Sequence, residues 1–350
     1  MVFSSLFFNF FFLPIILIFY FFTKSDQLKN VILVFFSLIF YAWGEPIWFV
    51  LLIISAIVDY LNGIFVENNK DSKIAMLGVI STLIFNLGLL CTFKYADFFI
   101  ENVNFLLGSS FKAPGLILPI GISFYTFQTI SYTIDVYNGK VKAQRSFLNF
   151  LTFVTLFPQL VAGPIVRYSI IQNQLSKRQV SWEGFNKGVE RFCKGLFKKV
   201  AIANTAGAIA NQLLDKDIQS ITFFGGWMGL IIFGLQVYYD FSGYSDMAIG
   251  LGKIFGFDFN ENFNHPYTAK SITDFWRKWH MTLGTWFREY VYIPLGGNRG
   301  TKFKWLRNIL IVWFLTGFWH GASWSYILFG GFHGLLIITE RLGLEKLLNS

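Results

Sequence analysis

The sequence predicts an all-α, polytopic integral membrane protein. Of its 350 residues, 54% are hydrophobic and only 14% are charged, whereas a soluble domain carries roughly 25% charged residues. Several apolar runs reach the roughly 20 residues that a helix needs to cross the hydrocarbon core of a bilayer. The chain also contains 44 Phe and 11 Trp, whose rings fill gaps between helices and anchor at both membrane interfaces.

Eight apolar segments are predicted to be spanning helices. They cover residues 3–22, 31–43, 46–66, 74–93, 116–137, 147–165, 221–250 and 307–342. The last is expected to be broken into two, and residues 95–107 and 200–214 are shorter and ambiguous, so we expect about 8–11 spans. Only Gly44-Glu45-Pro46 separates the second segment from the third, which predicts a tight hairpin or kink.

These segments are expected to form one integral-membrane domain over residues 1–350, because no repeat or linker interrupts them. The N-terminal apolar run lacks a positively charged n-region and a small-residue cleavage site, so we expect a retained span and not a signal peptide. Cys91 lies in an apolar segment and Cys193 in a basic one, so we expect no disulfide.

The net charge of +9 predicts an orientation and not nucleic-acid binding. In membrane proteins, Lys and Arg gather in cytoplasmic loops. Residues 139–145 carry cations and no acid, residues 167–199 carry eight cations against two Glu, and residues 288–307 carry five cations against one acid. We expect these three segments to face the cytoplasm.

Residues 182–200 are predicted to form an amphipathic helix in the cytoplasmic interface, with Ser181 as its N-cap. Its apolar face consists of residues spaced by three and four, namely Trp182, Phe185, Val189, Phe192, Leu196 and Val200. The rest of the helix carries the cations Lys187, Arg191, Lys194, Lys198 and Lys199. This helix either anchors the fold or offers its basic face to an acidic carrier or a nucleotide phosphate, and the sequence leaves both interpretations open.

Two of the four histidines lie in polar surroundings. His265 precedes Pro266, which disfavours helical geometry and predicts a loop. Ser271 and Asp274 have the spacing of a capping box, so a helix is expected to begin there and to carry His280 about two turns in. That segment is too polar to span lipid, and must lie in the interface or line a water-filled cavity.

His320 lies in an apolar segment, where an imidazole costs free energy unless it has a partner or a function. Gly317 and Gly321 flank it and predict a close approach by a neighbouring helix, and Trp313 and Trp324 are expected near the same face. The residue is either a structural histidine that bridges packed helices or a general base, because the pKa of imidazole lies near the working pH.

Other chemistries find little support in the sequence. No His-x-x-x-His or Cys-x-x-Cys spacing exists, and His320 and His333 would point apart on one helix, so no metal site is predicted. No Gly-x-Ser-x-Gly elbow and no Gly-x-x-x-x-Gly-Lys loop is present. Asp240 and Asp246 lie in an apolar span, where they either have a function or cap a helix break at Ser242-Gly243-Tyr244-Ser245, the interpretation that we favour.

Five long motifs resemble the membrane-bound O-acyltransferase family, in its bacterial alginate O-acetyltransferase branch, over roughly residues 1–340. They are "LPIGISFYTFQTISYTIDVY", "LFPQLVAGPIVRY", "YYDFSGYSDMAIGLGKIFGFDFNENFNHPY", "TDFWRKWHMTLGTWFREYVYIPLGGNRG" and "TGFWHGASWSYILFGGFHG". The resemblance implies a bundle of spans with re-entrant and interfacial helices around a tunnel that meets both faces of the membrane.

The resemblance also implies roles for single residues. His320 matches the family's histidine in the membrane core, the expected catalytic base, and His280 matches a second polar position with an assisting or acceptor-positioning role. The candidate residues of the substrate tunnel are Trp276, Arg277, Trp286, Tyr290, Asp240, Asp246 and Trp324. Members of this branch usually continue beyond the helix of His320 with further spans, so we expect either a short member of the family or a fragment of one.

The implied function is that of an O-acetyltransferase of the bacterial cytoplasmic (inner) membrane. The donor would be a cytoplasmic thioester, with acetyl-CoA as the first expectation. The acetyl group would pass to a hydroxyl of an exported polysaccharide, either an alginate-like exopolysaccharide or peptidoglycan. Expected partners are membrane lipids and extracytoplasmic acetyltransferase or polysaccharide-export proteins, and no permanently bound cofactor is expected. The alternatives are a D-alanyltransferase for teichoic acid that uses a carrier-protein thioester, and a non-catalytic transporter or scaffold of an export complex.

Overall fold

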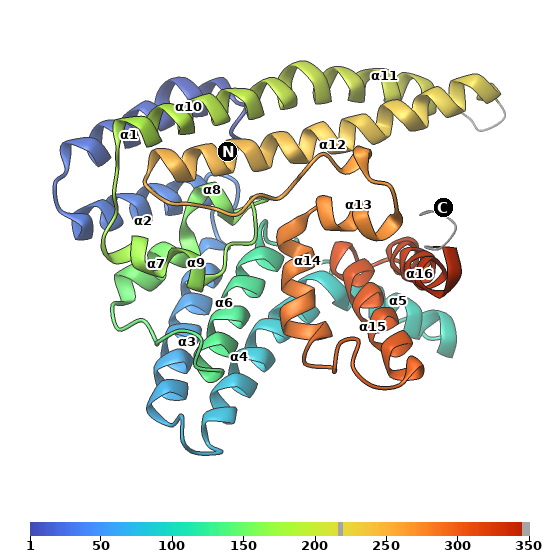
Figure 1. Ribbon diagram of the computed structural model, residues 1–350, viewed down its shortest axis with the longest axis horizontal. Helices are drawn as coiled ribbons and strands as arrows, with labels where there is room; N and C mark the ends of the chain where they lie inside the picture. The colour runs from blue at the N-terminus through green and yellow to red at the C-terminus, as the bar shows by residue number, and fades with distance from the viewer. Residues whose placement is uncertain (216–219, 345–350) are drawn as a thin grey trace. The chain divides into compact units, whose positions relative to one another are not determined.

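A computed structural model shows the chain as helices joined by turns and loops (Figure 1), and describes residues 1–215 and 220–344. No strand occurs in these two ranges, which confirms the prediction of an all-α protein. The C-terminal residues after 344, on which the expectation of a short member or a fragment rests, lie outside the described residues. Cys91 and Cys193 are both free, as expected.

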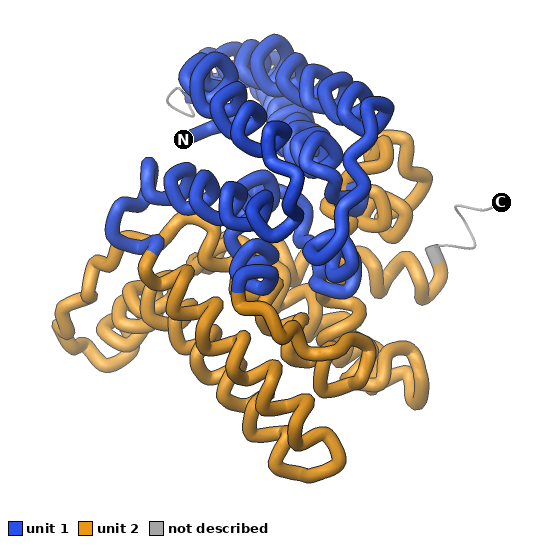
Figure 2. Tube along the Cα trace, turned by 90° about the vertical axis from the view of Figure 1, so that its left-hand side faces the viewer, with its two compact units in different colours: residues 1–49, 148–261 blue, residues 50–147, 262–350 orange. Residues whose placement is uncertain are grey.

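The chain divides into two compact units, each built from two separate stretches of sequence (Figure 2). The first unit comprises residues 1–49 and 148–261, and the second comprises residues 50–147 and 262–350. The main helices of the first unit are α1 (Leu13–Phe22), α2 (Asp26–Ala42), α7 (Phe147–Thr155), α8 (Phe157–Leu160), α9 (Tyr168–Ser176), α10 (Trp182–Phe197), α11 (Asn204–Leu214) and α12 (Phe223–Ile254). Those of the second unit are α3 (Phe49–Asn68), α4 (Ala75–Leu90), α5 (Ala96–Leu107), α6 (Ile122–Tyr137), α13 (Ile272–Lys278), α14 (Met281–Phe287), α15 (Lys302–His320) and α16 (Trp324–Thr339).

Two helical stretches of the described chain are long and apolar enough to cross a membrane, judged by length and composition. They are α3 and the continuous stretch Ala75–Leu107, which joins α4 to α5 through a π-helical turn. The bundle of about 8–11 spans therefore stays a prediction. The turn expected at Gly44-Glu45-Pro46 is present between α2 and α3, and the expected break in the segment 307–342 falls at residues 321–323.

Two of the predicted spans are wrong as single helices. The segment 116–137 becomes helical only from Ile122, because Gly121 takes a left-handed conformation (φ 78°) that ends the preceding loop. The segment 147–165 is divided at Leu156, whose extended ψ of 109° precedes a new helix that carries Pro158 in its first turn. Proline has no N–H to donate to the preceding turn, so one helix cannot continue through this position.

Paired glycines hold α10 and α12 side by side in the first unit (Figure 1). A Cβ on Gly195 would lie 2.5 Å from the carbonyl oxygen of Gly243, and a Cβ on Gly250 would lie 2.6 Å from that of Gly188. Small residues at such spacings let two helix backbones approach closely. The two helices therefore pack backbone against backbone at both pairs.

The predicted amphipathic helix begins where the sequence predicts, but the residues that it buries are only partly those of the predicted apolar face. Ser181 Oγ accepts a hydrogen bond from the Gly184 N–H at 3.0 Å and caps α10 as expected. Phe192 is buried beside the two glycines, whereas Trp182 of the predicted apolar face is 76% exposed. The location of this helix in a membrane interface stays a prediction.

We predict that Gly195→Ala lowers the free energy of unfolding by about 1–3 kcal/mol, because its methyl group forces α10 away from α12. Gly226→Ala is the matched control in α12, since its nearest neighbour, a methyl carbon of Ile221, would lie 3.4 Å away. The control should unfold no earlier than the parent, because Ala favours helix over Gly. Thermal unfolding in one detergent compares the three proteins, and equal midpoints for the two variants would contradict the close contact.

Candidate active site

His280 lies between two short helices and not inside one. Helix α13 begins as predicted, with Ser271 Oγ accepting a hydrogen bond from the Asp274 N–H at 3.1 Å, but it ends at Lys278. His280 itself has φ 45° and ψ 52°, a left-handed conformation, and α14 starts at the next residue. The prediction that one helix carries His280 two turns in is therefore wrong.

The side chain of Asn262 explains this backbone conformation. Its Oδ1 accepts hydrogen bonds from the N–H and the hydroxyl of Thr282, at 3.3 and 2.9 Å, and its backbone oxygen accepts one from the Met281 N–H at 2.9 Å. His280 Nδ1 lies 3.0 Å from the same Oδ1. Because that oxygen is an acceptor, Nδ1 must carry the proton, which leaves the lone pair of the ring on Nε2. Asn262 and His280 are both buried, at 0% and 3% exposure.

His320 is the last residue of α15, immediately before the break that separates α15 from α16. A Cβ on Gly317 would lie 2.3 Å from the carbonyl oxygen of Tyr326, and one on Gly321 would lie 2.3 Å from the Tyr326 ring. The predicted close approach by a neighbouring helix is thus confirmed, with α16 as the neighbour. The expectation that Trp324 shares a helix face with His320 is wrong, because Trp324 starts the next helix.

One indole, that of Trp319, lies next to both imidazoles. Its ring centroid is 6.1 Å from that of His280 and 5.0 Å from that of His320. On another side, the ring of Tyr326 lies 6.3 Å from the His320 ring. Across residues 1–215 and 220–344, no hydrogen bond reaches the His320 side chain, and the residue is exposed. Its described contacts are with aromatic rings, and the choice between a structural histidine and a general base stays a prediction.

Lys94 and Tyr95 support the end of α15, and sequence reasoning missed both. Lys94 Nζ donates to the carbonyl oxygen of Trp319 and, at 3.2 Å, to Ser123 Oγ, while Tyr95 Oη donates to the carbonyl oxygen of Phe318 at 3.0 Å. The last carbonyl groups of a helix have no partner within the helix, and a cation there also suits the helix dipole. The available signal was a single lysine within an otherwise apolar run.

Of the remaining tunnel candidates in the second unit, Trp276 and Arg277 line a cavity of about 870 Å³. Trp286 is buried, donates its indole N–H to the carbonyl oxygen of Phe127 at 2.9 Å, and stacks on that ring with centroids 3.8 Å apart. Its contacts are those of helix packing, and its role in a tunnel stays a prediction.

Two further candidates make side-chain hydrogen bonds within the same unit. Tyr290 donates its hydroxyl to Asp135 Oδ2 at 2.8 Å, which links the segment after α14 to α6. Trp324 donates its indole N–H to Asn102 Oδ1 at 2.9 Å and so ties α16 to α5. Neither residue lines the 870 Å³ cavity.

A family model described as the membrane-bound O-acyltransferase family matches residues 142–344, a range that contains both candidate histidines and Trp319. This chain belongs to that family. Among its relatives, "Probable alginate O-acetylase AlgI" of Pseudomonas aeruginosa is 41% identical over 97% of this chain, and "Peptidoglycan O-acetyltransferase" of Helicobacter pylori is 37% identical over 97% of it. "Teichoic acid D-alanyltransferase" of Bacillus subtilis is 30% identical over 63% of the chain. The match covers 66% of the alginate O-acetylase, 70% of the peptidoglycan enzyme and 58% of the D-alanyltransferase.

Asp240 and Asp246 belong to the first unit and form ion pairs there. Helix α12 runs unbroken through both, so the favoured interpretation of a capped helix break is wrong. Asp246 pairs with Lys198 at 2.6 Å and with Arg191 at 2.7 Å, and Asp240 pairs with Lys199. These carboxylates are charge partners for the basic side of α10 and of the π-helical segment Lys198–Ala203 that continues it.

A buried polar network inside the apolar helices also escaped sequence reasoning. Asp59 of α3 is 0% exposed and accepts a hydrogen bond from Asn86 Nδ2 of α4 at 2.8 Å. Asn86 Oδ1 in turn accepts from Ser55 Oγ at 3.2 Å and from Thr129 Oγ1 of α6 at 3.3 Å. Polar side chains in apolar helices face one another because lipid offers them no partner, so this network fixes how the three helices pack.

We predict that His280→Ala is less stable than His280→Gly by about 1–2 kcal/mol, although alanine is the larger and better helix-forming residue. Both variants lose the bond to Asn262, but only alanine has a Cβ that strains a left-handed backbone. Thermal unfolding of the two variants in one detergent measures the difference. The reverse order would contradict the conformation described for this residue.

We predict that Lys94→Met lowers the free energy of unfolding by about 1.5–3 kcal/mol, because the carbonyl oxygen of Trp319 loses a charged donor. Lys112→Met is the matched control, since Lys112 is exposed in the loop after α5 and such surface changes stay within about 0.5 kcal/mol. If both variants unfold at the same temperature, Lys94 does not support the end of α15.

Proposed function

We propose that this chain transfers an acetyl group from a cytoplasmic thioester, acetyl-CoA in the first instance, to a hydroxyl group of an exported polysaccharide. Membership of the O-acyltransferase family supports the reaction type. The alginate and peptidoglycan relatives named above each match 97% of this chain, and their names state O-acetylation, which supports a polysaccharide acceptor. The site would then lie in the bacterial inner membrane, with the final transfer passing directly or through an extracytoplasmic partner protein.

The observation that carries the proposal is the pair of imidazoles that lie against the Trp319 ring. Asn262 fixes the ring of His280, whereas the side chain of His320 has no hydrogen bond among the described residues. A general base must be accessible to the proton that it removes. His320 meets this condition, because it is exposed at the end of α15. His280 is buried and held in one tautomer by Asn262, so we assign it the assisting role and not that of the base.

The reaction then proceeds as an ordinary acyl transfer. The imidazole of His320 takes the proton of the acceptor hydroxyl while the oxygen attacks the thioester carbonyl. As the tetrahedral intermediate collapses, the carbon–sulfur bond breaks and the departing thiolate receives the proton from the imidazolium. The products are an O-acetyl ester and a free thiol. Exclusion of water from the site prevents hydrolysis of the thioester.

D-alanyl transfer to teichoic acid is the second candidate, and the match to the Bacillus subtilis enzyme favours it. That match covers 63% of this chain, whereas the match to the alginate O-acetylase covers 97% with higher identity, so we favour acetyl transfer. The two reactions release different groups on mild base treatment, which distinguishes them.

We predict that His320→Ala and His320→Gln each lower O-acetylation by about 100-fold or more, because general base catalysis is worth about 10²–10⁴-fold. Cells that express each variant at matched membrane level are assayed for base-labile acetate and D-alanine in the exported polysaccharide and the cell wall. His265→Asn is the control, since His265 is exposed in a loop with φ 47° and Asn tolerates that conformation. Unchanged acetate in both His320 variants would return this residue to a packing role, and loss of D-alanine instead of acetate would favour the second candidate.

A further inference from the structure

We propose that the buried polar network of α3, α4 and α6 binds one monovalent metal cation, Na⁺, at the carboxylate of Asp59. The network lies within the second unit, and the inference goes beyond the proposed acyl transfer. Two of its three helices belong to the stretches that are long and apolar enough to cross a membrane. An ionisable residue inside such a stretch is costly unless its charge is bound.

Each of the three helices contributes two polar side chains that are four residues apart and therefore lie on one face. These pairs are Ser55 and Asp59 on α3, Thr82 and Asn86 on α4, and Thr129 and Thr133 on α6. Figure 1 labels the three helices, and none of the six residues is more than 1% exposed. The network is therefore closed both to lipid and to bulk water.

The carboxylate of Asp59 has no counterion among the described residues. Its Oδ2 accepts a hydrogen bond from Asn86 Nδ2 at 2.8 Å, whereas Oδ1 is buried and has no hydrogen-bond partner of normal geometry. No Lys, Arg or His of the ranges 1–215 and 220–344 forms an ion pair with it. The lysine of the neighbouring span, Lys94, binds the carbonyl oxygen of Trp319 instead. A buried charge of this kind is unfavourable without a cation.

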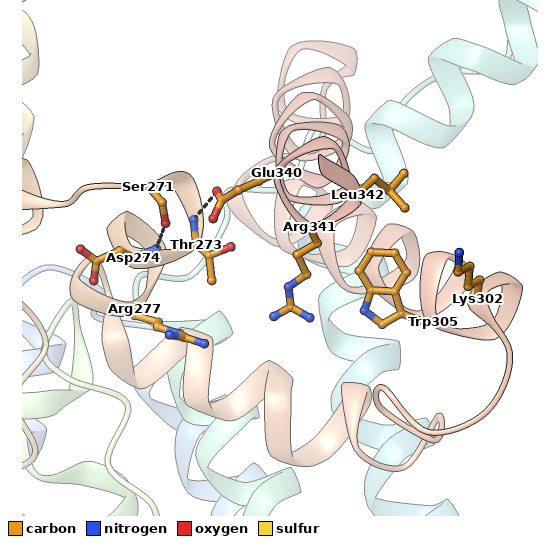
Figure 3. A pocket seen from close by; sticks show the side chains of 9 residues that line it. All are labelled: Ser271, Thr273, Asp274, Arg277, Lys302, Trp305, Glu340, Arg341 and Leu342. Atoms are coloured by element: carbon orange, nitrogen blue, oxygen red, sulfur yellow. Dashed lines mark hydrogen bonds between the residues drawn. The ribbon is translucent and has the colours of Figure 1, made fainter. Parts of the chain in front are cut away.

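Other buried carboxylates of the second unit have cations beside them. Asp135 forms an ion pair with Lys140 at 3.3 Å. Glu340 accepts a backbone N–H at 2.9 Å and lines a cavity of about 500 Å³ whose wall also carries Arg277 and Arg341 (Figure 3). The carboxylate of the network has no such neighbour in the part of the chain that the structure describes.

The hydroxyl groups of the network lie near this carboxylate but direct their protons elsewhere. Those of Ser55, Thr82 and Thr129 are within its reach. Ser55 and Thr129 donate to Asn86 Oδ1 at 3.2 and 3.3 Å. Thr82 donates to Thr133 Oγ1 at 3.2 Å. The lone pairs of several oxygens therefore surround one anionic group.

These hydrogen bonds are longer than those of other hydroxyl groups in the same protein. Hydroxyl donors usually lie about 2.7–2.8 Å from an oxygen acceptor. Thr152, Thr155 and Thr316 each donate to the carbonyl oxygen four residues earlier at 2.8 Å. In the network, by contrast, Thr129 lies 3.3 Å from the carbonyl oxygen of Thr126. The long distances indicate that the oxygens of the network do not satisfy one another and have room for a further ligand.

The ligand that suits these oxygens is a cation of the size of Na⁺. Carboxylate, carboxamide and hydroxyl oxygens are hard ligands. A single carboxylate matches a single positive charge, and the described residues contain no group of three or more His, Cys, Asp or Glu that could hold a metal ion. Oxygens that bind one ion at about 2.4 Å lie about 3.4 Å apart in octahedral geometry. The distances of 3.2 and 3.3 Å from Asn86 Oδ1 to the two hydroxyl oxygens approach this value.

A proton is the competing occupant, and the number of oxygens argues against it. A protonated carboxyl group donates one hydrogen bond and so needs one acceptor. The network instead gathers three hydroxyl oxygens and a carboxamide oxygen near the same carboxylate. Several oxygen ligands around one charge are the arrangement that a metal cation requires.

The site lies on the helix that backs the candidate active site. Helix α6 carries Thr129 toward the network, and two residues earlier it carries Phe127, whose ring centroid lies 5.6 Å from that of Trp319. A cation that joins α6 to α3 and α4 therefore also stabilises the helix against which Trp319 packs.

The test measures binding of radioactive Na⁺ to the purified full chain in detergent, and thermal unfolding in NaCl or in choline chloride at equal ionic strength. NaCl should raise the unfolding midpoint by at least about 2 °C, because a ligand that binds only the folded state stabilises it. Asp59→Asn should abolish both the binding and the shift. Asp71→Asn is the matched control, since Asp71 is exposed in the turn between α3 and α4.

Two further comparisons separate a cation site from a network that only joins helices. Thr129→Val should weaken Na⁺ binding by about 10-fold, because it replaces a hydroxyl ligand with a methyl group, and Thr129→Ser should retain it. In choline chloride, Asp59→Asn should unfold no earlier than the parent, because the amide removes an uncompensated charge. A network that only joins the helices predicts earlier unfolding of this variant in both salts.

Absence of Na⁺ binding by the folded parent would overturn the inference, as would binding that Asp59→Asn leaves unchanged. Equal stabilisation by KCl and NaCl would refute the choice of ion. An unfolding midpoint that depends on pH through Asp59, and not on Na⁺, would assign the site to a proton and so contradict the proposal.

Discussion

The end of helix α15 determines where the histidine of the candidate site stands. A helix that ends among apolar segments exposes carbonyl groups that lipid cannot bind. Here Lys94 and Tyr95 bind the carbonyl groups of Trp319 and Phe318, and the extended backbone of Gly321 stops the helix one residue later. A cation among apolar helices is costly unless it is bound, so the lysine and the helix end satisfy each other. His320 stands at this end as a consequence.

A second constraint acts on the other histidine and gives it a different character. The carboxamide of Asn262 fixes the ring of His280 through Nδ1 and fixes the backbone around it through Thr282. A left-handed conformation costs a residue other than glycine about 1–2 kcal/mol, and such strain persists only where surrounding contacts impose it. One imidazole is therefore held rigidly and buried, while the other is exposed and unbound by the described side chains. This difference is the reason why we propose His320, and not His280, as the base.

Local features could be read from the sequence, and contacts between distant segments could not. The Ser181 and Ser271 caps lie within three residues of the N–H groups that they accept from, so their spacing predicted them. The backbone of His280 depends on Asn262, which is 18 residues away, and the support for α15 comes from Lys94, 225 residues away. Contacts between distant segments also explain why α12 is unbroken. Asp240 and Asp246 pair with cations of α10 and of the segment that continues it, so neither carboxylate caps a helix end.

The two units differ in how their cations are partnered. A count of Lys and Arg along the sequence does not tell which of them pair with carboxylates in the folded chain. In the first unit, Asp246 forms ion pairs with both Lys198 and Arg191, and Arg191 forms a second ion pair with Glu261 at 2.6 Å. In the second unit, four arginines and no Asp or Glu are among the described residues that line the cavity of about 870 Å³. Like charges that share one concave site repel one another, so the packing of these helices does not by itself account for four arginines in one wall.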